Sequence, residues 1–263
     1  MRLNIVTGSS NSLGKTFLIA LANENDTTIG LSRRGCAIAN VHNISVDLQD
    51  TAQVRKILFD TLTTVDINKL TSVHLFHTAW KVKNEFNDIN NPKFTTLDLN
   101  QDWIDDEVFG STFMTLKNTH NALVECLNNL WKNDLPKFIN IIWTLLDKRA
   151  SEPSSHKSMV KTNKLIRAYV TWLCTQDPTY KWVCVSVWTI ATENEITYRK
   201  YWEHQYWLKE QMVVDSILKR NEVFLNEFTD ADLFMHNPKY ETYYKHETPE
   251  QMVVRFKKEI GIS

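Results

Sequence analysis

The first residues of the chain contain a glycine-bearing stretch of a kind that can hold a phosphate. Leu3 to Val6 form a short apolar run, and Gly8 and Gly14 enclose a polar turn. An apolar helical pattern then begins at Phe17. A strand, a glycine-bearing turn and a helix form the first unit of a dinucleotide-binding fold. The start of such a helix presents free backbone N–H groups and a positive dipole end, which suit a pyrophosphate. An ordinary turn between a strand and a helix is the alternative.

Three polar side chains close the second predicted strand, Thr27 to Ser32. Ser32, Arg33 and Arg34 begin eighteen residues after Gly14, where an NAD site would carry an acidic residue to hold the ribose 2′-hydroxyl. A hydroxyl and two guanidinium groups are instead the chemistry of a 2′-phosphate clamp, because Arg pairs with phosphate through planar donors. One such contact, worth about 1.5–3 kcal/mol, would favour NADP over NAD by about tenfold to a hundredfold. The alternative is that both arginines are solvated loop charges.

These side chains need strands and helices that alternate along the chain. The predicted strands are Leu3–Val6, Thr27–Ser32, Asn43–Asp47, Ser72–Ala79, Phe138–Thr144 and Trp182–Trp188, with a possible last strand at Glu222–Phe228. The predicted helices are Phe17–Leu21, Thr51–Leu62, Asp102–Trp131, Ser155–Thr175 and Tyr198–Lys219, and a further one begins at Thr248–Glu250. The loop from Lys81 to Gln101 is long enough to be functional or mobile. This order predicts an α/β fold: a Rossmann-like, doubly wound and mostly parallel sheet with helices on both faces.

Length and composition exclude several classes of protein. The 263 residues suit one domain, 1–263, in which 189–263 form the substrate-side cover and the C-terminal segment. With 43% apolar and 23% charged residues, general disorder is excluded. A net charge of −1 without an extended basic face gives no support to a nucleic-acid or membrane partner.

The cysteines and the start of the chain bear on its compartment. The four cysteines have no metal-ligand spacing, so we expect no metal and reduced thiols in a cytoplasmic protein. The chain enters a predicted strand at once, so we expect no signal peptide. The longest apolar run, Phe138 to Leu146, is too short to span a bilayer.

Over nearly the whole chain, the order of elements resembles the short-chain dehydrogenase/reductase family. Thr7 to Gly14 looks like the TGxxxGxG turn of that family, with Ser12 in place of the middle glycine. Ser32-Arg33 is similar to its NADP-preferring signature, and Asp47-Leu48 to its adenine-contacting Asp. His77-Thr78-Ala79-Trp80 occupies the place of its NNAG stretch and keeps only the alanine. The resemblance implies that NADP(H), preferred over NAD(H), is held by Gly8, Ser10, Ser12, Leu13, Gly14, Ser32, Arg33, Arg34, Asp47, Leu48, His77, Thr78, Ala79, Lys164 and Thr192.

The resemblance is weaker where the family carries its catalytic groups. Family members use a Tyr and a Lys four residues later on the helix after strand five, so that both lie on one face. The Lys and the nicotinamide lower the pKa of the Tyr, which then shuttles a proton. None of the eight tyrosines here has a Lys four residues on. Alignment makes Lys164 the counterpart of the Lys and Val160 that of the Tyr, and a shifted register gives Lys161 and Lys157.

Other family features have partial counterparts. Thr144 or Ser151 could replace the Ser that orients the substrate oxygen. The Asn expected in the long helix falls near Val108 or Phe109 and is absent, and the Pro-Gly after strand six is replaced around Val187-Trp188. Thr192 could match the Thr that follows that Pro-Gly.

A substitute proton donor must come from another residue. His156 has a suitable side chain, since the unperturbed pKa of His lies near 6.5, and it precedes Lys164 by eight residues, about two helical turns. A loop or helix-cap histidine is the alternative. Tyr198, Tyr201 and Tyr206 come from the segment that usually covers the substrate in this family and are further candidates.

The resemblance leaves three functions open. The first is an NADP-dependent oxidoreductase acting on a carbonyl or alcohol with a non-standard proton donor, in which Lys164 holds the nicotinamide ribose and Thr144 lies near the substrate oxygen. The second is a catalytically silent relative that serves as a cofactor-binding sensor or partner subunit. In the third, Ser12 and Trp80 close the site and leave an interaction scaffold. A small-molecule substrate and a homodimer or homotetramer are the expected partners, because many family members self-associate through two of these helices.

Overall fold

The strands of this chain form one parallel sheet. A computed structural model describes residues 1–80, 104–130, 139–146, 157–177, 180–187, 190–192 and 208–224. Its strands are β1 (Arg2–Thr7), β2 (Thr27–Ser32), β3 (His42–Ser45), β4 (Ser72–His77), β5 (Ile139–Leu146) and β6 (Lys181–Val187). They pair in the order β3-β2-β1-β4-β5-β6, and every neighbouring pair is parallel. The predicted doubly wound, Rossmann-like sheet is therefore confirmed.

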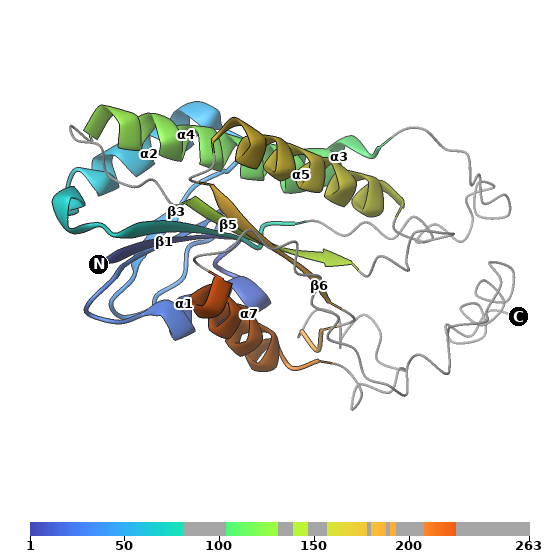
Figure 1. Cartoon of the computed structure of the whole chain (residues 1–263), viewed down its shortest axis with the longest axis horizontal. Coiled ribbons are helices and arrows are strands. Elements are labelled where there is room, and N and C mark those ends of the chain that lie inside the picture. The colour runs from blue at the N-terminus through green and yellow to red at the C-terminus, as the bar shows by residue number, and fades with distance from the viewer. Residues whose placement is uncertain are drawn as a thin grey trace, which may run out of the picture.

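Helices cover both faces of this sheet (Figure 1). One face carries α1 (Ser12–Leu21) and α7 (Glu210–Phe224). The other carries α2 (Thr51–Leu62), α3 (Asp106–Phe109), α4 (Thr115–Leu130) and α5 (Lys157–Gln176). A 3-10 turn, Ile67–Lys69, precedes β4. Within the described residues, no helix is both long and apolar enough to cross a membrane.

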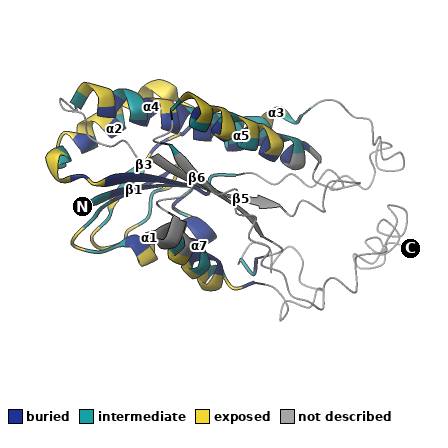
Figure 2. Ribbon diagram, in the orientation of Figure 1, coloured by how far each residue is buried: buried dark blue, intermediate teal, exposed yellow. Residues whose placement is uncertain are grey.

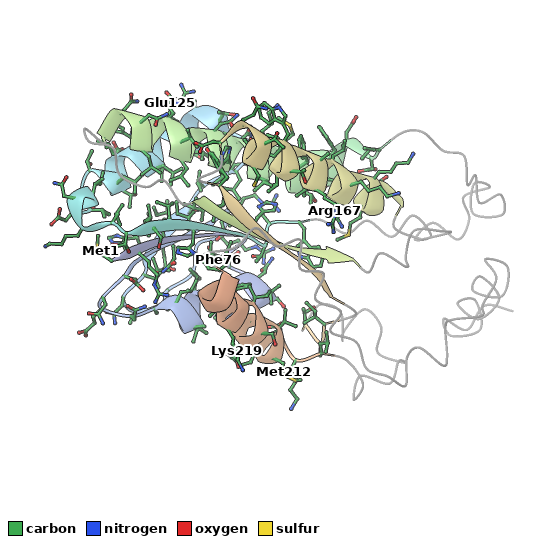
Figure 3. All side chains as sticks on the ribbon, in the orientation of Figure 1. Met1, Phe76, Glu125, Arg167, Met212 and Lys219 are labelled. Atoms are coloured by element: carbon green, nitrogen blue, oxygen red, sulfur yellow. The ribbon has the colours of Figure 1, made fainter. Side chains whose placement is uncertain are left out.

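The central strand β1 shows how the sheet is buried on both sides. Leu3 and Ile5 pack into the core under α2, α4 and α5, whereas Val6 packs against α1 and α7. All three side chains are fully buried, and buried residues line the sheet-facing sides of the helices in Figure 2. On the face that carries α1 and α7, the ring centroids of Phe76 of β4 and Phe17 of α1 lie 5.1 Å apart. Phe76 is labelled in Figure 3. Burial on both faces explains why these strands read as apolar runs without strict alternation.

The long helical region begins later than predicted. The predicted helix started at Asp102, but α3 begins at Asp106, with Asp105 as its N-cap. The Asp105 carboxylate accepts hydrogen bonds from the N–H groups of Glu107 and Val108, at 3.0 and 3.1 Å, and so fixes the start. A π-helical turn, Gly110–Met114, then joins α3 to α4.

The possible strand at Glu222–Phe228 is wrong over its described part. Glu222 to Phe224 continue α7, and the rest of that stretch lies outside the described residues. The helix persists because Val213, Val214 and Ile217 are buried at helical spacing against α1. The helix start at Thr248–Glu250 and the loop from Lys81 to Gln101 also lie outside the described residues.

Candidate functional site

The predicted site residues that follow β1, β2, β3 and β4 lie at the carboxyl edge of the sheet. In a parallel sheet all strands end on the same side, and ligands bind outside those carboxyl ends where the strand order reverses. Here β1 and β4 are central neighbours, and the chain progresses outward from them in opposite directions. The turn after β1 and the residues after β4 therefore meet at the switch point.

Two glycines of the turn after β1 allow this close approach. Gly8 has φ +69°, and a Cβ added there would lie 2.7 Å from the backbone nitrogen of Ala79 and 2.8 Å from the Thr78 carbonyl. A Cβ on Gly14 would meet the Gly8 carbonyl oxygen, and it would lie 2.6 Å from the Thr78 hydroxyl. Both positions therefore require glycine, the first for its conformation and for space, the second for the packing of α1.

The N-terminus of α1 has no capping bond from the side chain that precedes it. The N-cap residue, Asn11, makes no side-chain capping bond. The first helical bond runs from the Lys15 N–H to the Asn11 carbonyl at 3.1 Å, so the N–H groups of Ser12, Leu13 and Gly14 precede the helical ladder. They carry the positive end of the helix dipole, which favours an anion.

Ser12 occupies the turn in a left-handed conformation. Its φ is +41°, which L-residues adopt at a cost and glycine adopts freely. The Ser12 hydroxyl donates a hydrogen bond to the carboxylate of Glu210, the first residue of α7. The side chain that replaces the middle glycine is thus bonded to a helix almost two hundred residues later in the chain.

His77 anchors the end of β4 to the π-helical turn. Its Nε2 donates to the Thr112 carbonyl at 2.9 Å, so its Nδ1 accepts from the Thr7 hydroxyl at 2.8 Å. Burial lowers the pKa of His77 to about 4, against the opposing effect of the Thr112 bond. The ring is therefore neutral and both of its nitrogens are bonded within the protein. The Thr78 hydroxyl donates to the Thr7 carbonyl at 2.6 Å, and Ala79 and Trp80 are partly exposed.

The end of β2 combines a buried hydroxyl with two exposed cations. Ser32 is 4% exposed, and its hydroxyl is one of the buried groups that have no hydrogen-bond partner in the described part of the chain. Arg33 and Arg34 follow it, and both are exposed. Buried polar groups are normally bonded. An unpaired hydroxyl followed in the sequence by two exposed arginines is consistent with an anionic ligand.

The residues after β3 divide between surface and core. Asp47 is exposed, and its carboxylate accepts the Gln49 N–H at 3.0 Å. Leu48 is 5% exposed and belongs to the core, while its carbonyl accepts a hydrogen bond from the Asn118 amide at 3.2 Å. Asp47 is thus the accessible member of the predicted pair.

The buried side of α5 carries residues other than its lysines. Lys164 is exposed, whereas Met159 and Asn163, one turn apart, are 1% and 6% exposed. The Nδ2 of Asn163 is buried and has no hydrogen-bond partner among the residues that the structure describes. Met159, Thr162, Ile166 and Val170 form the buried stripe that sets this orientation. Sequence reasoning missed Asn163 because three lysines nearby offered more familiar chemistry.

The remaining predicted residues are described only in part. Thr144 lies on β5, opposite Val185 of β6 and two residues before the strand ends, but its side chain and all of His156 lie outside the described residues. Ser10 is partly buried in the turn after β1. Thr192 follows a short parallel bridge between Ile190 and Leu208, and the Ala191 N–H donates to the Leu208 carbonyl at 2.8 Å.

The same architecture occurs in solved dehydrogenases. A short-chain dehydrogenase from Burkholderia cenocepacia J2315 in complex with NADP has a TM-score of 0.65 and 15% identity, with 97% of this chain and 96% of that one covered. An alcohol dehydrogenase from the archaeon Thermococcus sibiricus, complexed with 5-hydroxy-NADP, has a TM-score of 0.63 and 12% identity, with 94% and 100% covered. Ligand-free aldohexose dehydrogenase of Thermoplasma acidophilum has a TM-score of 0.64 and 14% identity, with 94% of this chain and 97% of that one covered. The fold is that of short-chain dehydrogenases. No protein-family model matches the sequence, and no curated protein matches it.

Proposed function

We propose that this chain binds NADP(H) across the carboxyl edge of its sheet and is an oxidoreductase acting on a carbonyl or an alcohol. The observation that carries the proposal is the turn after β1. Gly8 leaves no room for a side chain beside Thr78 and Ala79, and the same turn leads into the N-terminus of α1, which its N-cap side chain does not cap. Solved structures of this fold bound to NADP and to 5-hydroxy-NADP support the choice of ligand.

The residues present fit the adenosine and phosphate half of the cofactor. The N-terminus of α1, which its N-cap side chain does not cap, suits the pyrophosphate, and Asp47 is accessible for the adenine amino group. The unpaired hydroxyl of Ser32, with Arg33 and Arg34, suits the 2′-phosphate. The preference for NADP(H) over NAD(H) rests on these three residues.

The nicotinamide half and the substrate would be served by residues nearer β5 and β6. A bound nicotinamide cofactor supplies or accepts hydride. In this proposal Thr192 holds the carboxamide end and Thr144 orients the substrate oxygen. The role that the family resemblance gives to Lys164 at the nicotinamide ribose would require this side chain to reach the site from its exposed position on α5. His156 moves the proton, because the side chain of His changes charge near neutral pH.

One observation favours a second candidate, a nucleotide-binding relative without catalytic activity. The inward pair on α5, Met159 and Asn163, carries a thioether and an amide. Neither group exchanges a proton near neutral pH. Loss of a positioned acid or base costs about 10²–10⁴ in rate, so such a protein would bind the nucleotide and turn over slowly or not at all.

Titration with NADPH and NADH tests the binding proposal. We expect both to raise the thermal midpoint, since a ligand that binds only the folded state stabilises it. The R33A/R34A double variant should lose about tenfold to a hundredfold in NADPH affinity and change little with NADH. K56A/K69A removes two exposed lysines elsewhere and is the charge-matched control. Equal losses for both nucleotides would contradict the 2′-phosphate assignment, and no shift with either would contradict the proposed function.

Single-turnover oxidation of NADPH against a panel of carbonyl compounds separates the two candidates. An oxidoreductase consumes the bound cofactor with at least one carbonyl, and H156A abolishes that reaction if His156 is the donor. Unchanged rates in H156A would exclude this role. Nucleotide binding without turnover on any carbonyl would favour the inactive relative.

A further inference from the structure

The first residue of α7 bonds to the first turn of α1. One carboxylate oxygen of Glu210 accepts from the Ser12 hydroxyl, and the other accepts from the Thr16 hydroxyl at 2.9 Å. The two helices lie side by side on one face of the sheet (Figure 1), and Val213 and Val214 bury the contact from the α7 side. Met212 and Lys219 lie on the outer side of α7 (Figure 3). Glu210 is thus directed toward α1 by the packing of its own helix.

This carboxylate lies at the N-termini of two helices. Glu210 is the first residue of α7 and Ser12 is the first residue of α1. Each N-terminus carries a partial positive charge that stabilises an anion within its first turn. A carboxylate bonded to the Ser12 hydroxyl also lies within about 6 Å of the Ser12 N–H, as bond lengths and one hydrogen bond dictate. A protein carboxylate therefore lies beside the N–H groups that our proposed function gives to a phosphate.

We infer that Glu210 sets the affinity of this site for the nucleotide by acting as an internal anion beside the pyrophosphate. The inference rests on the proposed function. Two like charges about 7 Å apart, at an effective dielectric constant of about 40, weaken binding by a factor on the order of tenfold. Removal of the Glu210 charge should therefore strengthen NADPH binding. The pairing also gives a role to Ser12, because a glycine in its place could not bond to the carboxylate.

The variant E210Q isolates the charge from the packing. Glutamine has the same size. Its amide oxygen accepts from one of the two hydroxyl groups of Ser12 and Thr16, and its NH2 group donates to the other, so α7 should stay against α1. The control D215N makes the same change in net charge on the same helix. Asp215 is exposed, and its carboxylate bonds to Gln211 at 2.7 Å. A second variant, E210A, removes both the charge and the hydrogen bonds.

The inference is tested by the dissociation constant for NADPH of each variant. These constants are measured on the full chain by calorimetry, at low and at high salt. We expect E210Q to bind about tenfold more tightly than the unaltered protein at low salt, E210A to bind more tightly as well, and D215N to be unchanged. High salt should reduce the difference in NADPH affinity between E210Q and the unaltered protein, because ions screen the repulsion between the Glu210 carboxylate and the pyrophosphate.

Three outcomes would overturn the inference. If E210A binds more weakly and E210Q equals the unaltered protein, Glu210 serves only to position α1. If D215N gains as much as E210Q, the effect is one of net charge. If no protein in the set binds NADPH or NADH, the proposed function fails and this inference fails with it.

Discussion

Replacement of Gly8 by alanine tests the close approach of the turn after β1 to the end of β4. Gly8 has φ +69°, and an L-residue in the left-handed region costs about 1–2 kcal/mol. The added Cβ would also lie 2.7 Å from the Ala79 nitrogen and 2.8 Å from the Thr78 carbonyl. These are backbone atoms that cannot rotate away, so overpacking adds about 1–3 kcal/mol. We expect G8A to lower the free energy of unfolding by about 2–5 kcal/mol.

Gly35 provides a matched control for the conformational part of this cost. Its φ is +64°, almost the same as that of Gly8, but the nearest atom to an added Cβ is the Ser45 Cβ at 3.9 Å. G35A should therefore cost only about 1–2 kcal/mol. The gain from a stiffer unfolded chain, about 0.4–1 kcal/mol, is common to both variants and cancels in the comparison.

Urea unfolding followed by tryptophan fluorescence measures both values, since the chain contains nine tryptophans. The difference between G8A and G35A reports the contact with Thr78 and Ala79 alone. If G8A is no less stable than G35A, the turn can move away from β4 at little cost. The tight junction at the switch point would then not be a structural requirement.

Two further predictions concern buried ionisable groups. Burial lowers the pKa of His74, His77 and His120 to about 4 in the folded protein, so the unfolded chain takes up their protons first as the pH falls below about 6.5. The contribution of these three histidines to the free energy of unfolding should be constant above that pH and decrease toward pH 4, and equilibrium unfolding at several pH values in that range that shows no decrease would contradict this. Although burial raises the pKa of Asp26, hydrogen bonds from Arg2 and Asn23 lower it overall, and loss of that charge in D26N should cost about 1–3 kcal/mol in a urea titration. D60N, which alters an exposed pair with Lys56, should stay within about 0.5 kcal/mol, and equal effects would refute a special role for Asp26.

The sheet could be predicted from the sequence because its signals are local. The strand at Thr27–Ser32 and the helix at Thr51–Leu62 are confirmed at both ends, since each is an apolar pattern enclosed by polar turn residues. The sequence does not fix the start of the long helix, because Asp102, Asp105 and Asp106 have side chains that can each act as an N-cap. Only the structure shows that Asp105 fills that position.

Only those parts of the candidate site whose residues are close together in the sequence could be predicted. Gly8 and Gly14 were found from their spacing, whereas Glu210 lies 198 residues from Ser12 and meets it only because α7 packs on α1. The orientation of α5 depends on which of several overlapping apolar faces meets the sheet. Its buried face includes Asn163 and leaves Lys164 exposed. The spacing of residues along the helix does not distinguish this orientation from one in which Lys164 faces inward.

The bridge between Ile190 and Leu208 ties the stretch after β6 to the residues just before α7. The Ala191 N–H bonds to the Leu208 carbonyl at 2.8 Å, and α7 begins at Glu210, two residues after Leu208. The position of α7 on the sheet, and with it the reach of the Glu210 carboxylate to α1, therefore depends on an anchor beyond the end of β6 as well as on the packing of Val213, Val214 and Ile217.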